Sequence, residues 1–152
     1  QNIKLAFIGS RDRLSRKIID LIDDAEARTQ NNDKMQLTVA LNYGSQEEIV
    51  SATKKVAEQV KNGELDPTDI DEKLFSQNLY TGGMPEPDMI IRTSGEKRLS
   101  NFMLWQIAYS ELYFSDKLWP DFYKEDFYEA LLNYQNRERR FGQTGEQVQE
   151  SR

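Results

Sequence analysis

Short apolar runs alternate with amphipathic stretches along most of this chain. Four apolar runs predict β-strands, and they cover residues 3–8, 35–41, 89–92 and 111–114. Three stretches carry apolar residues at helical spacing and predict amphipathic helices, over residues 14–25, 45–61 and 124–140. Strands that alternate with helices predict an α/β fold, with a mainly parallel sheet and flanking helices.

Local signals predict where several elements begin and end. Ser45 and Glu48 form an S-x-x-E pattern, which predicts a capping box at the start of the second helix. Asn62-Gly63 predicts the end of that helix. Asp66-Pro67 predicts the N-cap and first turn of a further short helix, which runs to about Phe75.

Two apolar segments are expected to be buried. Residues 35–41 are almost continuously apolar, which is typical of a parallel strand that is buried on both faces. Residues 102–109 are apolar and aromatic and predict a buried helix. The aromatic residues of this region predict core packing, with an interface or a ligand wall as the alternative; they are Trp105, Tyr109, Tyr113, Phe114 and Trp119.

Glycine and polar residues follow three of the predicted strands. They are Gly9-Ser10-Arg11, Asn42-Tyr43-Gly44 and the segment 92–95. Ligands of open parallel sheets bind outside the carboxyl ends of the strands, so these three strand ends are candidate binding positions. The segment that begins at Arg92 carries the most charge.

The strongest candidate chemistry lies in residues 92–100. Arg92 and Arg98 are forked cationic donors, and Ser100 adds a hydroxyl. The backbone near Gly95 supplies further donors that can surround phosphate oxygens. This composition predicts a clamp for a diphosphate. The alternative is an ordinary surface pair between an arginine and Glu96, and the local residues leave both interpretations open.

Two further candidates lie downstream. Glu111 follows an apolar run and is either a Mg²⁺ ligand or a paired carboxylate, and the local sequence does not separate these. Basic residues at 137–140 favour a helix C-terminus that they stabilise through the macrodipole. The alternative is a second anion-binding patch presented by Arg140 and Gly142.

Composition narrows the possible chemistry. The 152 residues predict one domain, and the net charge of −6 argues against a broad nucleic-acid surface. The chain has neither cysteine nor histidine, which excludes disulfides, thiol nucleophiles and imidazole catalysis. Carboxylates, arginine, lysine, tyrosine, hydroxyls and a hard metal ion remain. The sequence shows neither a spanning apolar run nor a signal peptide, and a cytoplasmic protein is expected.

Residues 87–142 contain three specific sequence motifs: PDMIIRTSGEKRLSNFMLWQIAYSELYF, LWPDF and NRERRFG. Together they resemble the C-terminal half of the cis-prenyltransferases, the undecaprenyl diphosphate synthase family. KLAFIGSRDRL and VALNYGSQEEIV look like the central strands of that family. The resemblance implies that residues 1–142 form the C-terminal part of such a catalytic domain, and residues 143–152 are expected to be a disordered polar tail.

The resemblance implies a function. Members of this family add isopentenyl diphosphate with cis geometry to an allylic diphosphate, usually farnesyl diphosphate, with Mg²⁺ as cofactor. The bacterial product is undecaprenyl diphosphate, the membrane-associated lipid carrier for cell-wall peptidoglycan synthesis. A cytoplasmic enzyme at the periphery of the membrane is therefore expected.

The resemblance also implies roles for individual residues. Arg92, Arg98 and Ser100 would bind the diphosphate of isopentenyl diphosphate, and Glu111 would help to hold Mg²⁺. Arg140 and Gly142 match the family's C-terminal RxG element, which reaches the site of the neighbouring subunit. A homodimer is implied, and this match replaces the local interpretation of the arginine cluster.

One departure from the family is large. The family's N-terminal Met-Asp-Gly-Asn-Gly-Arg-Trp motif, whose aspartate binds Mg²⁺, does not occur in this sequence. The chain is therefore expected to be the C-terminal part of a synthase, without a catalytic residue of its own and inactive without the N-terminal half. The alternatives are a non-catalytic subunit of a two-component cis-prenyltransferase and a phospho-ligand-binding module. The complete set of Arg92, Arg98 and Ser100 favours the catalytic lineage.

Overall fold

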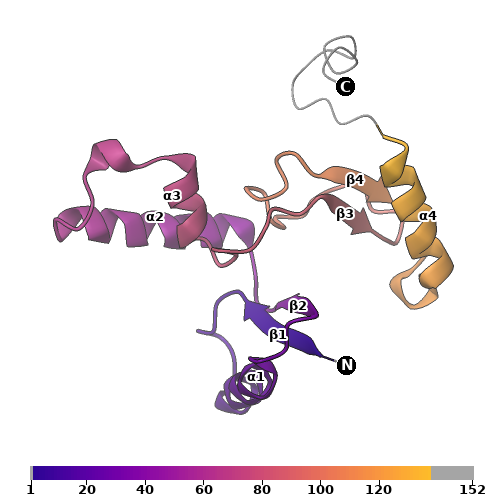
Figure 1. The fold of residues 1–152 in the computed structure, drawn as a ribbon, viewed down its shortest axis with the longest axis horizontal. Helices are drawn as coiled ribbons and strands as arrows, with labels where there is room; N and C mark the ends of the chain where they lie inside the picture. Colours follow the sequence, from indigo (N-terminus) through magenta and orange to yellow (C-terminus); the bar gives the residue numbers. More distant parts are fainter. Residues whose placement is uncertain (1, 138–152) are drawn as a thin grey trace, which may run out of the picture. The chain divides into compact units, whose positions relative to one another are not determined.

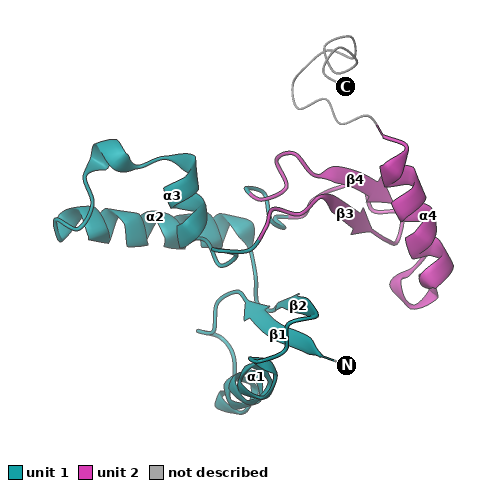
Figure 2. Ribbon diagram, viewed as in Figure 1, with its two compact units in different colours: residues 1–84, 101–105 teal, residues 85–100, 106–152 magenta. Residues whose placement is uncertain are grey.

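The computed structural model describes residues 2–137 (Figure 1). The chain divides into two compact units, shown in teal and magenta in Figure 2. Unit 1 contains residues up to 84 together with residues 101–105, and unit 2 contains residues 85–100 and those from 106 onward. Each unit has one pair of parallel strands, so the predicted α/β class is confirmed. The strands lie in two separate two-stranded sheets among the described residues, rather than in one.

A β-α-β element opens unit 1. Strand β1 (Ile3–Ile8) runs parallel to β2 (Met35–Ala40), with Ile3 opposite Met35 and Ile8 opposite Ala40. Helix α1 (Arg16–Thr29) connects them and packs against β1. The Ser15 side chain caps α1 by accepting a hydrogen bond from the Ile18 amide. Both strands and the helix appear where the apolar pattern predicts them.

The burial expected for β2 is wrong within the described chain. Met35, Leu37 and Val39 are 52%, 47% and 36% exposed, respectively. These alternate residues share one face of the strand, since side chains of a β-strand alternate between faces. The helix that packs on this sheet contacts β1, which leaves the apolar stripe of β2 open. The apolar residues of α1 are also only partly covered, because Ile22 is buried whereas Leu21 is 60% exposed.

The second part of unit 1 is helical. Helix α2 (Ser45–Lys61) packs against α3 (Glu72–Asn78), as Figure 1 shows. The predicted end of α2 is confirmed, because Asn62 is its C-cap and Gly63 follows with φ of +74°.

The expected single helix from Asp66 to Phe75 is wrong. Asp66 does cap a turn, η1 (Pro67–Asp69), by accepting from the Thr68 amide, but this turn ends at Ile70. Asp71 then caps α3 as a separate helix, accepting from the Leu74 amide at 2.7 Å. Because the side chain of this second aspartate caps a new helix, the segment forms two short elements rather than one.

The predicted capping box at the start of α2 is also wrong. Gly44 is the N-cap, so Ser45 and Glu48 lie inside the helix. Both side chains are almost fully buried, at 0% and 1% exposure. The Ser45 hydroxyl accepts a hydrogen bond from the Leu104 amide at 2.9 Å. The two residues that match the capping-box pattern therefore bind other segments of the chain.

Glu48 joins two of these segments to α2. One carboxylate oxygen accepts from the Tyr43 hydroxyl at 2.5 Å, and the other accepts from the Tyr80 amide at 2.8 Å. A buried carboxylate is tolerated where hydrogen-bond donors replace its water. Glu48 therefore fixes the chain just before α2 and the chain just after α3.

The expected buried helix over residues 102–109 is wrong. This stretch consists of turns, and Phe102, Leu104 and Tyr109 are 39%, 39% and 67% exposed. Asn101 and Met103 have φ of +61° and +49°, in the left-handed region, which a right-handed helix cannot include. The apolar content of a segment does not by itself show which residues adopt the left-handed conformation.

Unit 2 contains the second strand pair. Strand β3 (Met89–Arg92) runs parallel to β4 (Glu111–Phe114), with Met89 opposite Glu111. The chain after β4 forms the short helix η2 (Trp119–Asp121). Helix α4 (Lys124–Gln135) then buries Ala130 completely.

Helix α4 is shorter than predicted. It ends at Gln135 rather than continuing to residue 140. At its start, Asp126 accepts from the Tyr123 amide at 2.8 Å and pairs with Lys117 at 2.5 Å. Both contacts lower the pKa of Asp126, with the Lys117 hydrogen bond as the larger cause. Gly142 and the expected polar tail over residues 143–152 lie outside the described residues. Within residues 2–137, none of the helices has the length and apolar character needed to cross a membrane.

Replacing Glu48 tests its structural role. We expect Glu48→Ala to leave the Tyr80 amide without an acceptor and to lower the free energy of unfolding by about 1–3 kcal/mol for each group left unpaired. Urea denaturation followed by circular dichroism measures this change. Glu47→Ala is the matched control, because Glu47 is exposed on the same helix. Equal losses in the two variants would contradict the assignment.

Candidate functional site

The loop after β3 contains the candidate phosphate-binding residues. Ser94 and Gly95 have φ of +69° and +67°, so the chain turns through two left-handed residues. Their amides are engaged: Ser94 donates to the Lys117 carbonyl at 2.7 Å and Gly95 to the Ser115 carbonyl at 2.9 Å. The prediction that backbone donors near Gly95 surround phosphate oxygens stays a prediction, and these two amides do not supply such donors. They instead fix the loop against the chain that follows β4.

Arg92 and Arg98 lie together in unit 2. The Arg92 guanidinium donates to the backbone carbonyl of Arg98, and Arg98 forms an ion pair with Glu96. The Arg98 side chain is 69% exposed, and that of Glu96 is 37% exposed. The pairing with Glu96 is the alternative that the sequence left open. An exposed pair of this kind is weak, so the Arg98 guanidinium keeps its capacity for another anion.

Ser100 closes the same loop. It is exposed and has φ of +50°, again in the left-handed region. The loop thus begins at Arg92, which is half-buried at the end of β3, and ends at an exposed hydroxyl. Arg92, Arg98 and Ser100 remain predicted ligand residues.

Glu111 is the first residue of β4 and is paired. Its carboxylate accepts from Arg137 at 2.7 Å, and Arg137 also donates to the Leu112 carbonyl at 3.0 Å. The side chain of Glu111 is 26% exposed. Residues 2–137 contain no group of three or more acidic side chains that could hold a metal ion by themselves. Mg²⁺ is commonly held by one or two carboxylates together with water and substrate phosphates, and a single glutamate fits that donor set.

The C-terminal basic cluster is described only in part. Arg140 and Gly142 lie outside the described residues, so their predicted roles stay predictions. Arg137 is described, and its partners are Glu111, the Leu112 carbonyl and the Asn133 side chain. Arg137 therefore binds two residues of β4, in addition to any interaction with the helix dipole.

The aromatic residues divide between packing and exposure. Trp105 packs on Phe75, with ring centroids 4.6 Å apart, and its indole N–H donates to Ser76 at 2.9 Å. Tyr109 and Trp119 are 67% and 73% exposed. Core packing therefore describes Trp105, while these other two aromatic rings lie largely in solvent.

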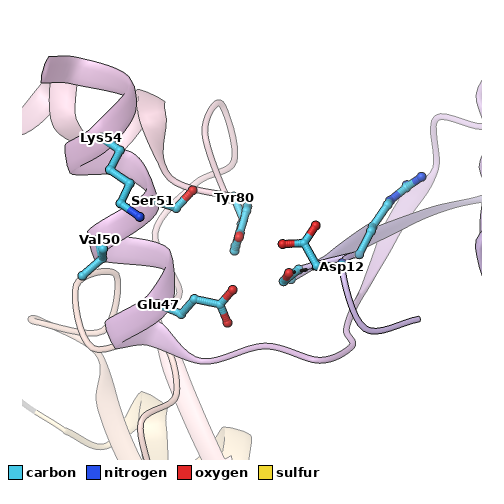
Figure 3. A pocket seen from close by; sticks show the side chains of 9 residues that line it. Asp12, Glu47, Val50, Ser51, Lys54 and Tyr80 are labelled. Carbon is cyan, nitrogen blue, oxygen red and sulfur yellow. Dashed lines mark hydrogen bonds between the residues drawn. The ribbon is translucent and has the colours of Figure 1, made fainter. Parts of the chain in front are cut away.

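A pocket of about 380 Å³ lies in unit 1 (Figure 3). It is lined by the loop after β1, by one side of α2 and by Tyr80; its residues are Gly9, Ser10, Arg11, Asp12, Glu47, Val50, Ser51, Lys54 and Tyr80. Figure 3 shows the carboxylates of Asp12 and Glu47 on opposite sides of the opening. The first predicted strand end thus borders a pocket, whereas Asn42-Tyr43-Gly44 does not line it.

The charges around this pocket are mixed. Arg11 is held by Asp23 at 2.6 Å and by Glu26 at 3.2 Å, and the Asp23 hydrogen bond raises the pKa of Arg11. Burial is the main cause that raises the pKa of Tyr80, and the carboxylate of Glu47 adds to it. Gly9 must lack a side chain, because a Cβ there would lie 2.1 Å from the Leu41 carbonyl oxygen. The lining of this pocket includes none of the predicted diphosphate and Mg²⁺ ligands Arg92, Arg98, Ser100 and Glu111.

Comparison with known proteins identifies the family. The prenyltransferase family model for undecaprenyl diphosphate synthases matches residues 1–142. The chain belongs to this family.

Two relatives illustrate how this family member compares with others. It is 49% identical over 147 residues to the ditrans,polycis-undecaprenyl-diphosphate synthase ((2E,6E)-farnesyl-diphosphate specific) of Vibrio cholerae, covering 97% of this chain and 59% of that protein. It is also 49% identical over 142 residues to the tritrans,polycis-undecaprenyl-diphosphate synthase (geranylgeranyl-diphosphate specific) of Methanocaldococcus jannaschii, covering 92% of this chain and 51% of that protein. The chain spans about half the length of these curated relatives.

A solved structure supports the same fold. Lavandulyl diphosphate synthase from Lavandula x intermedia, in complex with dimethylallyl diphosphate, matches with a TM-score of 0.91 and 44% identity. The match covers 94% of this chain and 62% of that chain. The expectation of a cis-prenyltransferase fold is therefore confirmed for this undecaprenyl diphosphate synthase family member.

The contact between Tyr43 and Glu48 predicts a pH dependence of stability. Burial, followed by the hydrogen bond to Glu48, raises the pKa of the Tyr43 hydroxyl above its usual value of 10.0. Because the folded chain holds this proton more tightly than the unfolded chain, the stabilisation is complete below about pH 10 and is lost as the pH rises further. We expect the parent chain to lose stability above pH 10 more steeply than Tyr43→Phe does.

Urea denaturation at pH 8, 10 and 11 measures this difference. At pH 8 the Tyr43→Phe variant should be less stable by about 1–3 kcal/mol, because the Glu48 carboxylate loses a donor. Parallel pH profiles for the two proteins would show that Tyr43 is not the titrating group.

Proposed function

We propose that this chain supplies the isopentenyl diphosphate site of an undecaprenyl diphosphate synthase. The observation that carries the proposal is the co-location of Arg92 and Arg98 in one loop at the carboxyl end of β3, in a chain of this family. Two forked cationic groups in one loop at a strand end supply charge and donors that suit a diphosphate. Ser100 contributes a hydroxyl donor from the other end of the loop.

The protein that contains this chain would catalyse cis-prenyl chain elongation. In this reaction a carbon–carbon bond forms between the allylic carbon of one diphosphate substrate and the terminal alkene carbon of isopentenyl diphosphate. The carbon–oxygen bond of the allylic substrate breaks and its diphosphate group leaves, and the isopentenyl unit loses a proton, which restores an alkene. The relative from Vibrio cholerae is named for farnesyl diphosphate, and we propose the same allylic substrate here, with undecaprenyl diphosphate for cell-wall synthesis as the product.

In this reaction the arginines act by binding and orientation. Arg92 and Arg98 hold the diphosphate of isopentenyl diphosphate, so that its alkene is presented in a fixed position. Arg98 would exchange its exposed partner Glu96 for the substrate, at little cost in free energy. No histidine or cysteine is required by this chemistry, in keeping with the composition of the chain.

Glu111 is the residue that we propose for Mg²⁺. A bound divalent cation would neutralise diphosphate charge. Arg137 holds the Glu111 carboxylate in place through Oε2, and release of this ion pair would free that oxygen. Arg140 and Gly142 are proposed to contact substrate in the neighbouring subunit of a homodimer, as the family's RxG element implies.

Substitution of the two arginines tests the diphosphate site. We expect Arg92→Ala and Arg98→Ala each to weaken isopentenyl diphosphate binding by about tenfold to over a hundredfold, since a charged hydrogen bond contributes about 1.5–3 kcal/mol. Amide-resolved NMR titration of the 152-residue chain measures the dissociation constant and locates the shifts. Arg28→Ala is the control, because Arg28 is an exposed arginine paired with Asp24 on α1. Unchanged affinity in both variants would remove the proposed site.

The metal proposal has a separate test. We expect Mg²⁺ to strengthen isopentenyl diphosphate binding by the parent chain, and Glu111→Gln to reduce this gain, because the neutral amide is a poorer ligand for a hard cation. The titration is repeated with and without Mg²⁺ in both proteins. Glu125→Gln is the control, since Glu125 is exposed on α4 and outside the proposed site. An equal Mg²⁺ effect in Glu111→Gln and the parent would exclude Glu111 as a ligand.

A further inference from the structure

The diphosphate loop, residues 92–100, is held by the connection between β4 and η2, residues 115–118. The Ser94 amide donates to the Lys117 carbonyl at 2.7 Å. Ser94 has φ of +69°, in the left-handed region that a residue with a Cβ rarely adopts. Such a conformation persists where the surrounding contacts hold it. The hydrogen bond to Lys117 is therefore one of the contacts that maintain the shape of this loop.

Two further backbone hydrogen bonds join the same two segments. The Gly95 amide donates to the Ser115 carbonyl at 2.9 Å, and the Ser115 amide donates to the Arg92 carbonyl at 2.8 Å. The second of these bonds continues the parallel pairing of β3 with β4 just beyond the last residue of β4. Because Arg92 is a proposed diphosphate ligand, the β4–η2 connection sets the backbone position of a site residue. Both segments belong to unit 2.

The side chain of Lys117 joins this connection to α4. Its Nζ donates to Oδ1 of Asp126 at 2.5 Å, while Oδ2 of Asp126 accepts from the Tyr123 amide at 2.8 Å. The side chain of Asp126 is 10% exposed, whereas that of Lys117 is 55% exposed. A buried carboxylate with two donors has a defined position, and an exposed lysine without a partner has many rotamers. Asp126 therefore restricts where Lys117 and its carbonyl lie.

The surroundings of the Lys117 ammonium are acidic. The hydrogen bond between Lys117 and Asp126 is the largest cause that raises the pKa of Lys117 and lowers that of Asp126, so both groups are charged at neutral pH. The carboxylates of Glu129 and Asp121 also raise the pKa of Lys117. The ammonium is thus matched to carboxylates of unit 2, and its role at the loop is exerted through the backbone of Lys117.

We propose that Lys117 is a positioning residue for the diphosphate loop. Its ammonium is fixed on Asp126 at the start of α4, and its carbonyl fixes the Ser94 amide, two residues beyond the guanidinium of Arg92. A loop that is ordered before the substrate arrives binds more tightly, because less conformational entropy is lost on binding. This proposal rests on the function proposed above.

The test compares three variants of the 152-residue chain. Lys117→Met removes the ammonium but keeps a long side chain and the backbone carbonyl, and Lys117→Arg keeps a cation within reach of Asp126. Lys124→Met is the matched control, because Lys124 is an exposed lysine on α4 that lies over the Tyr128 ring, away from the loop. Isopentenyl diphosphate affinity is measured by NMR titration, and hydrogen exchange of the Ser94 amide is measured on the same samples.

We expect Lys117→Met to weaken isopentenyl diphosphate binding by about two- to thirtyfold, the range for residues that act on a site through other groups. The Ser94 amide should exchange faster in this variant, because its acceptor is less firmly held. Lys117→Arg should keep most of the affinity, and Lys124→Met should change neither measurement. Parental affinity in Lys117→Met, or an equal loss in Lys124→Met, would overturn the positioning role.

Asp126→Asn breaks the same ion pair from the other side. The amide keeps an oxygen that can accept from Tyr123, and it loses the charge that binds Lys117. We expect a similar loss of affinity, and Lys117→Met should add no further loss in the Asp126→Asn background, since the two residues act as a pair. Additive losses would show that Lys117 does not act through Asp126. If Lys117→Met does not fold, unchanged affinity in Asp126→Asn overturns the proposal on its own.

The Arg92→Ala variant separates this proposal from the one on which it rests. If Arg92→Ala loses affinity and Lys117→Met does not, the diphosphate site stands and the positioning role fails. If neither Arg92→Ala nor Arg98→Ala loses affinity, or if the parent chain does not bind isopentenyl diphosphate, the diphosphate site fails and the positioning role fails with it.

Discussion

The first turn of α2 imposes the constraint on which the rest of unit 1 depends. Its amides need acceptors, and its N-cap residue is a glycine without a side chain. Asn101 supplies the acceptors, and Ser45 returns a hydrogen bond to Leu104. Glu48, one turn further on, binds the chain before α2 and the chain after α3. A single helix start therefore organises three separate segments of the sequence.

Burial explains why this arrangement is specific. Ser45 and Glu48 are nearly inaccessible to solvent, so each polar atom that lost its partner would carry a desolvation penalty. Apolar contacts tolerate small shifts, whereas hydrogen bonds require defined distances and angles. The hydrogen bonds at α2 consequently restrict the positions of the connecting loops to a smaller range than apolar contacts alone would allow.

Periodicity predicted the local elements well, because strand and helix patterns depend on neighbouring residues. All four strands and the three long helices follow from it, although α4 ends early at Gln135. The predictions that failed needed long-range information. Ser45 and Glu48 fit a local capping box, yet distant segments engage them. The turns over 102–109 depend on left-handed residues, and the exposure of β2 depends on what packs beside it.

In the candidate site, too, the local contacts were predictable from the sequence and the long-range contacts were not. The proximity of Arg92 and Arg98 follows from six residues of separation and a turn at Gly95, and the sequence was sufficient to predict it. The pairing of Glu111 with Arg137 spans 26 residues and was not predictable from either residue alone.

The energetic character of these ion pairs bears on the proposed function. The pair of Arg98 with Glu96 is exposed and contributes little stability, so it can yield to a diphosphate without loss of the fold. The loop amides of Ser94 and Gly95, in contrast, are bonded to backbone carbonyls and hold the loop in shape. Rigid backbone and exchangeable side-chain partners are the combination that a binding loop needs, because the backbone preserves the geometry while the arginines change partner.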